Sequence, residues 1–253
     1  MVAERVENRQ VLEVSGADRV DFLQGLVTND VAKLENGMVY AALLSPQGKY
    51  LADFFLIRQG DAILIDVASE LATALLKRLT MYKLRADVVI KAVETPVARG
   101  LGAPPEGAFA DPRHAALGWR SYGAPGSDPV TDWEALRVAH LIPETTHELK
   151  PDDSYILEMG FERLNGVDFK KGCYVGQEVT ARMKHKTELR KGLAQVSLSG
   201  KADPGTPITS EGKPVGELMS VADGTALAYL RFDRAKGDMQ AGAASLTLSQ
   251  SED

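Results

Sequence analysis

A chain of 253 residues with 44% apolar and 25% charged residues has the composition of a soluble globular protein, and it is long enough for two or three compact units. The net charge of −6 argues against general nucleic-acid binding, so no direct nucleic-acid partner is expected. No apolar run approaches the roughly 20 residues that cross a bilayer, and residues 1–10 are too charged for a secretory signal. With only one cysteine, these features predict a cytoplasmic protein without membrane contact.

The N-terminal part of the chain alternates between strand and helix patterns. Residues 11–14 predict a strand, and Ser15 and Asp18 have the spacing of a capping box for the helix that follows. Three further strands are predicted at residues 38–44, 50–57 and 62–67. A tight turn at residues 59–61 joins the last two strands.

The middle of the chain continues this α+β pattern. Ser69 can cap a second helix, and residues 88–93 return to strand. Residues 100–130 contain six glycines and five prolines, which favour short strands over a long helix. Thr131 and Glu134 form another capping-box pair, and the helix that they open is predicted to end at Pro143.

The most informative segment is residues 170–178, which read Lys-Lys-Gly-Cys-Tyr-Val-Gly-Gln-Glu. Cys173 is the only cysteine of the chain and cannot form an internal disulfide. Neighbouring lysines and the N-terminus of the helix predicted near residues 176–186 would both favour its thiolate. Residues 170–191 carry seven lysines or arginines and two glutamates, so this positive window suits an anionic ligand or partner, or else a solvated helix face.

Several chemistries remain open for the thiol of Cys173, besides simple packing. Sulfur handling, contact with a metal cluster and redox sensing all use a thiolate. Iron–sulfur centres typically need four ligands, largely cysteines, so this chain is not expected to hold a cluster alone. The histidines lack metal-ligand spacing with the cysteine, so no metal site is predicted, although a hydrolytic Cys–His pair stays open. These histidines are His114, His140, His147 and His185.

The run at residues 170–178 resembles the signature of the YgfZ family of folate-binding proteins, which is related to the T-protein (aminomethyltransferase) of the glycine cleavage system. Further segments that resemble landmarks of this family occur in the same order along nearly the whole chain. They are residues 21–31, 43–49, 82–86 and 212–216.

This resemblance implies an α+β protein built as a three-domain ring, similar to the aminomethyltransferase folate-binding fold, with a small C-terminal β-barrel. The first domain would be discontinuous, comprising residues 1–45 and 118–188, and would carry the Cys173 loop. The second would be inserted as residues 46–117, and the barrel would span residues 189–253. Short strand patterns separated by Gly, Pro and Asp after residue 191 independently predict the barrel.

The resemblance also implies a function. The chain would bind tetrahydrofolate or a derivative, with or without a polyglutamate tail, in a central cavity where the domains meet. It would support the assembly or repair of iron–sulfur enzymes, and through them tRNA modification, with Cys173 as the catalytic or functional thiol. The expected partners are the folate and iron–sulfur client or assembly proteins, and a monomer is expected.

Nine residues are expected to contact the folate, and for the lysines, Gln177, Glu178, Asn29, Asp30 and Arg85 a surface or structural role is the alternative. Lysines such as Lys170 and Lys171 could bind the glutamate tail, and Gln177 and Glu178 could satisfy donors of the pterin ring. Arg85 and Arg190 could hold a carboxylate. The nine residues expected to bind the cofactor are Lys171, Gly172, Tyr174, Gln177, Glu178, Asn29, Asp30, Asp53 and Arg85.

Asp53 discriminates between binding and catalysis. The T-proteins carry a paired Asp-Asp after two glycines, whereas residues 48–53 here read Gly-Lys-Tyr-Leu-Ala-Asp. Ala52 takes the place of the first acid, which puts aminomethyl transfer in doubt and leaves enzymatic activity undecided. The alternatives are a folate-dependent one-carbon transferase of the aminomethyltransferase type and a protein–protein scaffold that binds no folate.

Overall fold

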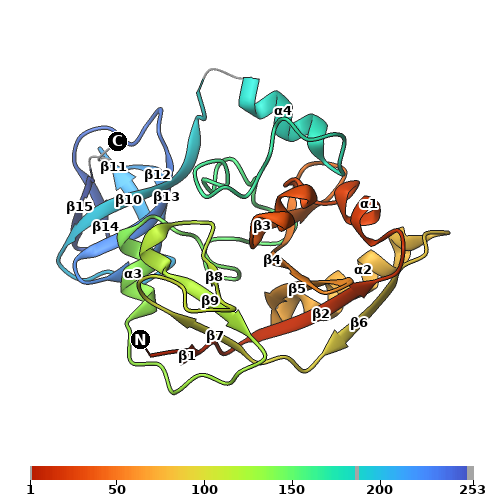
Figure 1. Ribbon diagram of the computed structural model, residues 1–253. Coiled ribbons are helices and arrows are strands. Elements are labelled where there is room, and N and C mark those ends of the chain that lie inside the picture. Colours follow the sequence, from red (N-terminus) through yellow and green to blue (C-terminus); the bar gives the residue numbers. More distant parts are fainter. Residues whose placement is uncertain (1, 186–187, 250–253) are drawn as a thin grey trace.

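The computed structural model describes residues 2–185 and 188–249, which fold into three β-sheets with four α-helices packed around them (Figure 1). The three sheets surround the centre of the molecule, and the C-terminal sheet lies at one side of the ring. No helix in the described part of the chain is both long and apolar enough to cross a membrane.

A five-stranded antiparallel sheet forms the first unit. Its strands, in spatial order, are β3 (Val39–Leu44), β4 (Tyr50–Gln59), β5 (Ala62–Ala68), β2 (Arg9–Ser15) and β6 (Val89–Val93). All six residues of β3 are buried because the sheet is covered on both faces. The strands predicted from apolar runs are therefore confirmed.

Two different layers cover the faces of this sheet. The 3₁₀ helix η1 (Val31–Glu35), α1 (Arg19–Gln24) and α2 (Ser69–Lys83) bury one face, together with alternate residues of β3 such as Ala41 and Leu43. The segment from residue 149 to 167, through Phe161 and Leu164, covers the other. Burial on both faces explains why β3 reads as a continuous apolar run instead of alternating.

A second sheet of four short strands packs beside the first. Its order is β1 (Glu4–Arg5), β7 (Val97–Gly100), β9 (Trp119–Tyr122) and β8 (Phe109–Ala110), with the 3₁₀ helix η2 (Ala115–Leu117) before β9. The short strands predicted from the glycines and prolines are confirmed. Gly118 has φ +62°, and a Cβ there would lie 2.1 Å from the Gly100 carbonyl oxygen, so a side chain does not fit.

The C-terminal part is a closed six-stranded barrel, as the sequence predicts. Its strands close in the order β10 (Lys191–Ser199), β13 (Thr225–Arg231), β12 (Lys213–Ala222), β11 (Pro207–Ser210), β14 (Met239–Ala241) and β15 (Ala244–Leu248). A compact apolar core, including Val196, Leu218 and Leu230, fills its interior. The barrel packs against α3 (Trp133–Ala139) of the α+β body.

The predicted helix starts are wrong in their details. The Asp18 carboxylate accepts from the Asp87 backbone N–H at 2.8 Å and does not cap α1. Ser69 is the first residue of α2, and no side chain caps that helix. The cap of α3 is Asp132, because the Thr131 hydroxyl instead donates to the Glu4 carboxylate at 2.7 Å. Tertiary partners have replaced local capping in two of these three cases.

The end of α3 also differs from the prediction. The helix ends at Ala139 and does not continue to Pro143. Leu141 has φ +54°, and the Ile142 N–H donates to the Arg137 carbonyl at 2.9 Å. A backbone hydrogen bond that spans a residue in the left-handed conformation commonly ends a helix, and it does not require a proline.

The predicted domain division remains a prediction. The strands β3 and β4 pair across the proposed boundary at residues 45 and 46, and β7 and β9 pair across the one at residues 117 and 118. The sheets therefore continue across both positions. The barrel begins with β10 at Lys191, close to the predicted boundary at residue 189.

Candidate functional site

The Cys173 loop is held to the body of the protein by a buried lysine. The ammonium of Lys171 donates to the backbone carbonyls of Gln24, Val27 and Asn29, at 2.8, 2.5 and 3.1 Å. Only 8% of Lys171 is exposed, and burial lowers its pKa to about 8, although Asp30 and Asp168 oppose this shift by their charge. All three N–H donors of the ammonium are used inside the protein. Lys171 is therefore a structural clamp between the loop and the end of α1.

The thiol next to this clamp faces solvent. Cys173 is exposed, as is Gly172, and a Cβ added at Gly172 would meet no atom within 4 Å. Tyr174, the next residue, is buried and lies under the Lys171 ammonium, 5.1 Å from the ring centroid. The buried residues Lys171 and Tyr174 thus flank an exposed Gly172–Cys173 pair, which a partner can reach.

The helix that follows the loop is locked by a close contact between two glycine turns. This helix is α4 (Gln177–His185), and Gly176 precedes it with φ +83°. A Cβ at Gly176 would lie 2.6 Å from the Ser45 carbonyl oxygen, and one at Gly48 would lie 2.7 Å from Val179. Two segments that the sequence singled out separately, residues 43–49 and 170–178, therefore pack against each other.

This contact predicts a stability difference between two glycine variants of the same loop. Gly176→Ala is expected to lower the free energy of unfolding by about 2 kcal/mol, because it adds left-handed strain and a backbone clash. Gly172→Ala is the matched control and should leave stability within about 0.5 kcal/mol of wild type. Urea unfolding curves measure both. Equal stabilities would contradict the close packing of α4 on the Ser45 turn.

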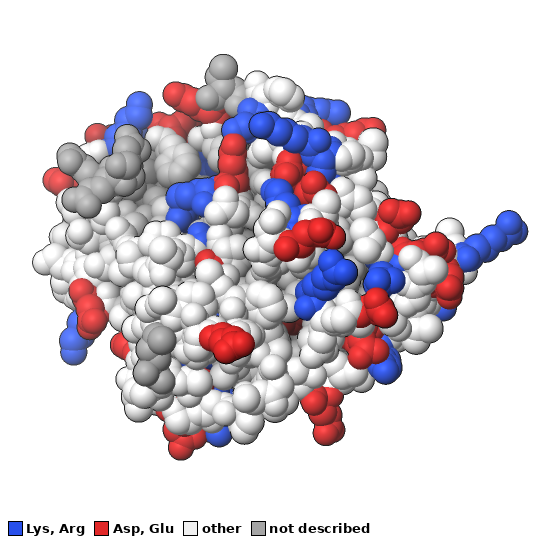
Figure 2. Space-filling model, viewed as in Figure 1, with Lys and Arg blue, Asp and Glu red and all other residues white. Residues whose placement is uncertain are grey.

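The first turn of α4 is solvent-accessible. Glu178 is exposed and Gln177 is half-buried, and neither side chain makes a hydrogen bond to a described residue. In Figure 2, lysines and arginines lie over this end of the molecule with acids between them. The ion pair of Lys184 with Glu162 partly neutralises the positive window of residues 170–191.

The predicted pair at Asn29 and Asp30 has structural partners. The Asn29 amide donates to the carbonyls of Tyr40 and Asn165 at 2.8 and 2.7 Å, and its oxygen accepts from Lys33. The Asp30 carboxylate caps η1 through the Ala32 N–H at 3.0 Å. These contacts anchor the same segment to which Lys171 is tied. Neither residue lines the cavity that contains Asp53.

Asp53 lies elsewhere, on β4, where it lines a cavity of about 300 Å³ between the two sheets. Its buried carboxylate accepts from the hydroxyls of Tyr40 and Tyr50, at 2.9 and 2.7 Å, and from that of Thr145. Burial, together with the charge of Asp53, raises the pKa of both tyrosines above the usual value. The Asp53 side chain is thus an acceptor held by three hydroxyls.

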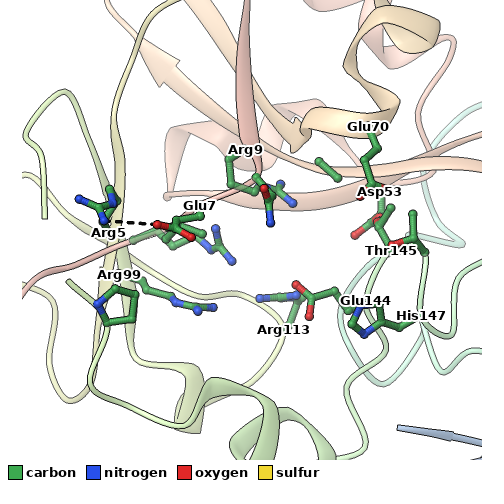
Figure 3. A pocket seen from close by; sticks show the side chains of 16 residues that line it. Arg5, Glu7, Arg9, Asp53, Glu70, Arg99, Arg113, Glu144, Thr145 and His147 are labelled. Carbon is green, nitrogen blue, oxygen red and sulfur yellow. Dashed lines mark hydrogen bonds and ion pairs between the residues drawn. The ribbon is translucent and has the colours of Figure 1, made fainter. Parts of the chain in front are cut away.

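The cavity is rich in arginine (Figure 3). Figure 3 shows Asp53 and Thr145 at one end and Arg5 and Arg99 at the other, with Arg113 between them. The lining residues come from separate parts of the chain. They are Arg5, Val6, Glu7, Asn8, Arg9, Asp53, Ala68, Glu70, Arg99, Arg113, Arg120, Pro129, Glu144, Thr145, Thr146 and His147.

Most of the inner arginines are paired with buried acids. Arg9 donates to the Asp66 carboxylate at 2.6 Å, and Arg113 makes a two-pronged contact with Asp111 at 3.0 and 2.8 Å. Arg120 lies between these acids, 3.3 Å from Asp66 and 3.4 Å from Asp111. Burial alone would raise the pKa of Asp111, but Arg113 and Arg120 lower it below its usual value. The pair of Arg120 with Asp66 joins the two sheets, because Arg120 lies on β9 and Asp66 on β5.

Arg99 differs from them, because no ion pair or hydrogen bond joins its guanidinium to another residue of the described ranges 2–185 and 188–249. Burial and the neighbouring Arg120 and Arg113 lower its pKa to about 9. A second cavity of about 220 Å³ shares Arg99, Arg113 and Arg120 with the first, so the two hollows adjoin.

The sequence-predicted site therefore separates into two places. Cys173, Lys171 and the start of α4 form the thiol face, and Asp53 alone of the nine predicted folate contacts lines the arginine-rich cavity. Arg85 is exposed just after α2, and Arg190 is exposed before β10. The cavity arginines escaped sequence reasoning because none of them stands in a recognisable motif.

In the part of the chain that the structure describes, no side chains are arranged as a metal site or as a hydrolytic Cys–His pair. This part of the chain contains no group of three His, Cys, Asp or Glu side chains placed to hold a metal ion. His114 and His140 stack on each other at 4.4 Å between ring centroids, and His147 contacts Arg137. No described histidine makes a hydrogen bond to Cys173.

Comparison with known proteins identifies the C-terminal barrel and the fold. A family model for the C-terminal β-barrel domain of CAF17 matches residues 190–252. The solved structure of the glycine cleavage system aminomethyltransferase T from Bartonella henselae aligns with a TM-score of 0.78. That alignment covers 99% of this chain and 85% of the other, at 14% identity, so it shows the fold alone. The predicted aminomethyltransferase-like fold is confirmed.

Sequence comparison finds relatives along most of the chain. It is 32% identical over 235 residues to the mitochondrial iron–sulfur cluster assembly factor IBA57 homolog of Mycosarcoma maydis, covering 79% of this chain and 58% of that protein. A second fungal relative, from Coccidioides immitis, is covered over 60% of its length. This chain thus spans about three fifths of these two proteins.

The human mitochondrial factor IBA57 is matched more completely. Identity is 30% over an alignment of 280 positions, and the alignment covers 93% of this chain and 79% of the human protein. The chain therefore belongs to the family of the iron–sulfur cluster assembly factor IBA57.

Proposed function

We propose that this protein supports the assembly or repair of iron–sulfur clusters and that Cys173 is its functional thiol. The observation that carries the proposal is the exposed thiol on a loop that the buried Lys171 ammonium clamps in place. Its relatives are named as iron–sulfur cluster assembly factors. A single cysteine supplies one ligand of the several that a cluster needs, so the thiol would act together with a client or assembly protein.

The finer parts of this proposal follow from the YgfZ resemblance. Support of tRNA modification would be indirect, through iron–sulfur enzymes that perform it, and no nucleic-acid contact is required of this chain. The named relatives are mitochondrial, whereas a cytoplasmic location and a monomeric state remain predictions for this protein.

We further propose that tetrahydrofolate or a derivative binds in the arginine-rich cavity, and not along the signature loop. The chemistry of the lining supports this placement. A pterin ring carries amide and amine donors that suit a carboxylate such as Asp53, and the glutamate end of a folate suits arginine. A volume of about 300 Å³, with the adjoining 220 Å³, is in the range of small-molecule sites.

Asp53→Asn tests this placement. Its affinity for tetrahydrofolate, measured by calorimetry, is expected to fall about tenfold, because one charge-assisted hydrogen bond is worth about 1.5 kcal/mol. Arg85→Ala is the control for the alternative site and should bind as wild type does. Loss of binding in Arg85→Ala, with none in Asp53→Asn, would place the folate outside the cavity. No heat with wild type would favour the scaffold alternative.

Aminomethyl transfer remains the alternative activity. It requires an acid or base at the folate nitrogens, and the only carboxylate of the residue 52–53 pair is Asp53, which three hydroxyls already hold. That environment favours binding over proton transfer. Formation of a one-carbon folate from tetrahydrofolate and an aminomethylated lipoyl carrier would establish the transferase instead.

A further inference from the structure

The partly buried guanidinium of Arg99 has no partner among residues 2–185 and 188–249. The Nε of Arg99, on β7, is buried and makes no hydrogen bond within the described residues. A buried donor without an acceptor costs about 1–3 kcal/mol. Such a cost in the wall of a cavity is a reason to look for a ligand that supplies the acceptor.

The acids near Arg99 have other partners. The Glu4 carboxylate accepts from the Thr131 hydroxyl and from the Trp133 indole N–H, both at 2.7 Å. Glu144 pairs with Arg137 at 3.2 Å. Both carboxylates act on Arg99 only through their charge, and the neighbouring cations Arg113 and Arg120 act against it. This end of the cavity therefore presents a cation that the protein itself does not neutralise.

The arginine is also fixed in direction. Its guanidinium carbon lies over the Trp133 ring, 4.0 Å from the centroid, and the hydrogen bond from the indole to Glu4 holds that ring. Stacking on an aromatic face restricts a guanidinium to one plane while leaving its edge free for hydrogen bonds. A preorganised edge of this kind suits a planar carboxylate, which it can bind through two parallel hydrogen bonds.

We propose that Arg99 is the residue that binds the ligand's carboxylate, and that it selects the glutamate end of a folate at the cavity end opposite Asp53 (Figure 3). This inference rests on the proposed folate binding. It names Arg99, rather than Lys171, as the residue that recognises the tail, since the Lys171 ammonium is saturated by three backbone carbonyls. Small dicarboxylates and phosphate share the same chemistry and form separate arms of the test.

The test compares two ligands that differ only in the glutamate, on three proteins. Tetrahydrofolate and tetrahydropteroate, which lacks the glutamate, are titrated into wild type, Arg99→Gln and Arg58→Gln. Arg99→Gln is expected to bind tetrahydrofolate at least tenfold more weakly and to bind tetrahydropteroate within twofold of wild type. Arg58 lies on β4 outside the cavity, is exposed and pairs with Glu35, so Arg58→Gln should leave both affinities within twofold of wild type.

Thermal unfolding separates a ligand-binding role of Arg99 from a structural role. A structural role predicts a lower unfolding temperature for Arg99→Gln, whereas a ligand-binding role does not. Without ligand, Arg99→Gln should unfold at the wild-type temperature or above it, since it removes a guanidinium whose buried Nε has no acceptor among the described residues. A lower unfolding temperature together with equal weakening of both ligands would make Arg99 a structural residue and overturn the proposal. Unchanged tetrahydrofolate affinity in Arg99→Gln would overturn it as well.

Failure of the folate proposal is separable from failure of the carboxylate site. If neither pterin ligand binds wild type, folate binding fails, and glutarate and inorganic phosphate then probe Arg99 directly. Stabilisation of wild type, but not of Arg99→Gln, by glutarate supports a carboxylate site. Stabilisation by phosphate alone, or equal effects on both proteins, overturns it.

Discussion

Cys173→Ala is expected to abolish support of iron–sulfur enzymes while leaving the fold intact. The side chain is exposed, so its loss should change the free energy of unfolding by less than about 0.5 kcal/mol. The activities of several iron–sulfur enzymes, measured in cells that lack the gene and carry the variant, should stay at the level of the deletion. Cys173→Ser should fail as well, because a hydroxyl does not ionise near neutral pH as a thiol does.

A surface variant far from the thiol controls this experiment. Lys213→Ala, on the exposed start of β12, should restore the enzymes as wild type does. Full rescue by Cys173→Ala would show that the thiol plays no part and would leave the loop with a purely structural role. Rescue by Cys173→Ser alone would replace thiolate chemistry with a hydrogen bond.

Lys171→Met is expected to produce the largest loss of stability among the loop variants. It leaves the carbonyls of Gln24, Val27 and Asn29 without their shared donor, which costs about 3 kcal/mol. For a chain of this length that loss lowers Tm by about 6–12 °C. Methionine approximates the volume of the lysine stem, so packing loss adds little.

The adjacent lysine is the matched control. Lys170 is exposed, and Lys170→Met should unfold within about 0.5 kcal/mol of wild type. The same two variants also test whether Lys171 contacts the folate. If Lys171 is only a structural clamp, Lys171→Met should weaken tetrahydrofolate binding no more than its lower stability explains. Equal stability of the two variants would mean that the ammonium does not hold the loop to α1.

Local pattern was sufficient for the main strands, whereas only the structure showed that Cys173 is exposed. The apolar runs of β3, β4 and β5 and the turn at residues 59–61 were read correctly, because strand patterns and turn residues act over short stretches of chain. Helix ends were read poorly. Thr131 and Asp18 both have side chains that can cap a helix. In the structure, however, each makes a hydrogen bond to a residue far away in sequence: Thr131 to Glu4, and Asp18 to Asp87.

The roles of Lys171 and the arginines required the tertiary structure. Lys171 donates to backbone carbonyls, including those of Gln24 and Val27. Because every residue has a backbone carbonyl, the side chains at these positions do not reveal the contact in the sequence. The pairing of strands in the sheet assembles the cavity. It places Arg9 next to Asp66, although the two residues are 57 positions apart in sequence. Sequence spacing alone does not encode such a contact.

The sequence by itself thus determined the fold class, the β-barrel, the signature loop with its single thiol, and Asp53 as a candidate for ligand binding. Only the tertiary structure showed that the thiol and the cavity lie in separate places, and that the Arg99 guanidinium has no partner among the residues that the structure describes. The physical reason is that secondary structure and loop chemistry arise from neighbours in sequence, whereas burial and charge balance arise from neighbours in space.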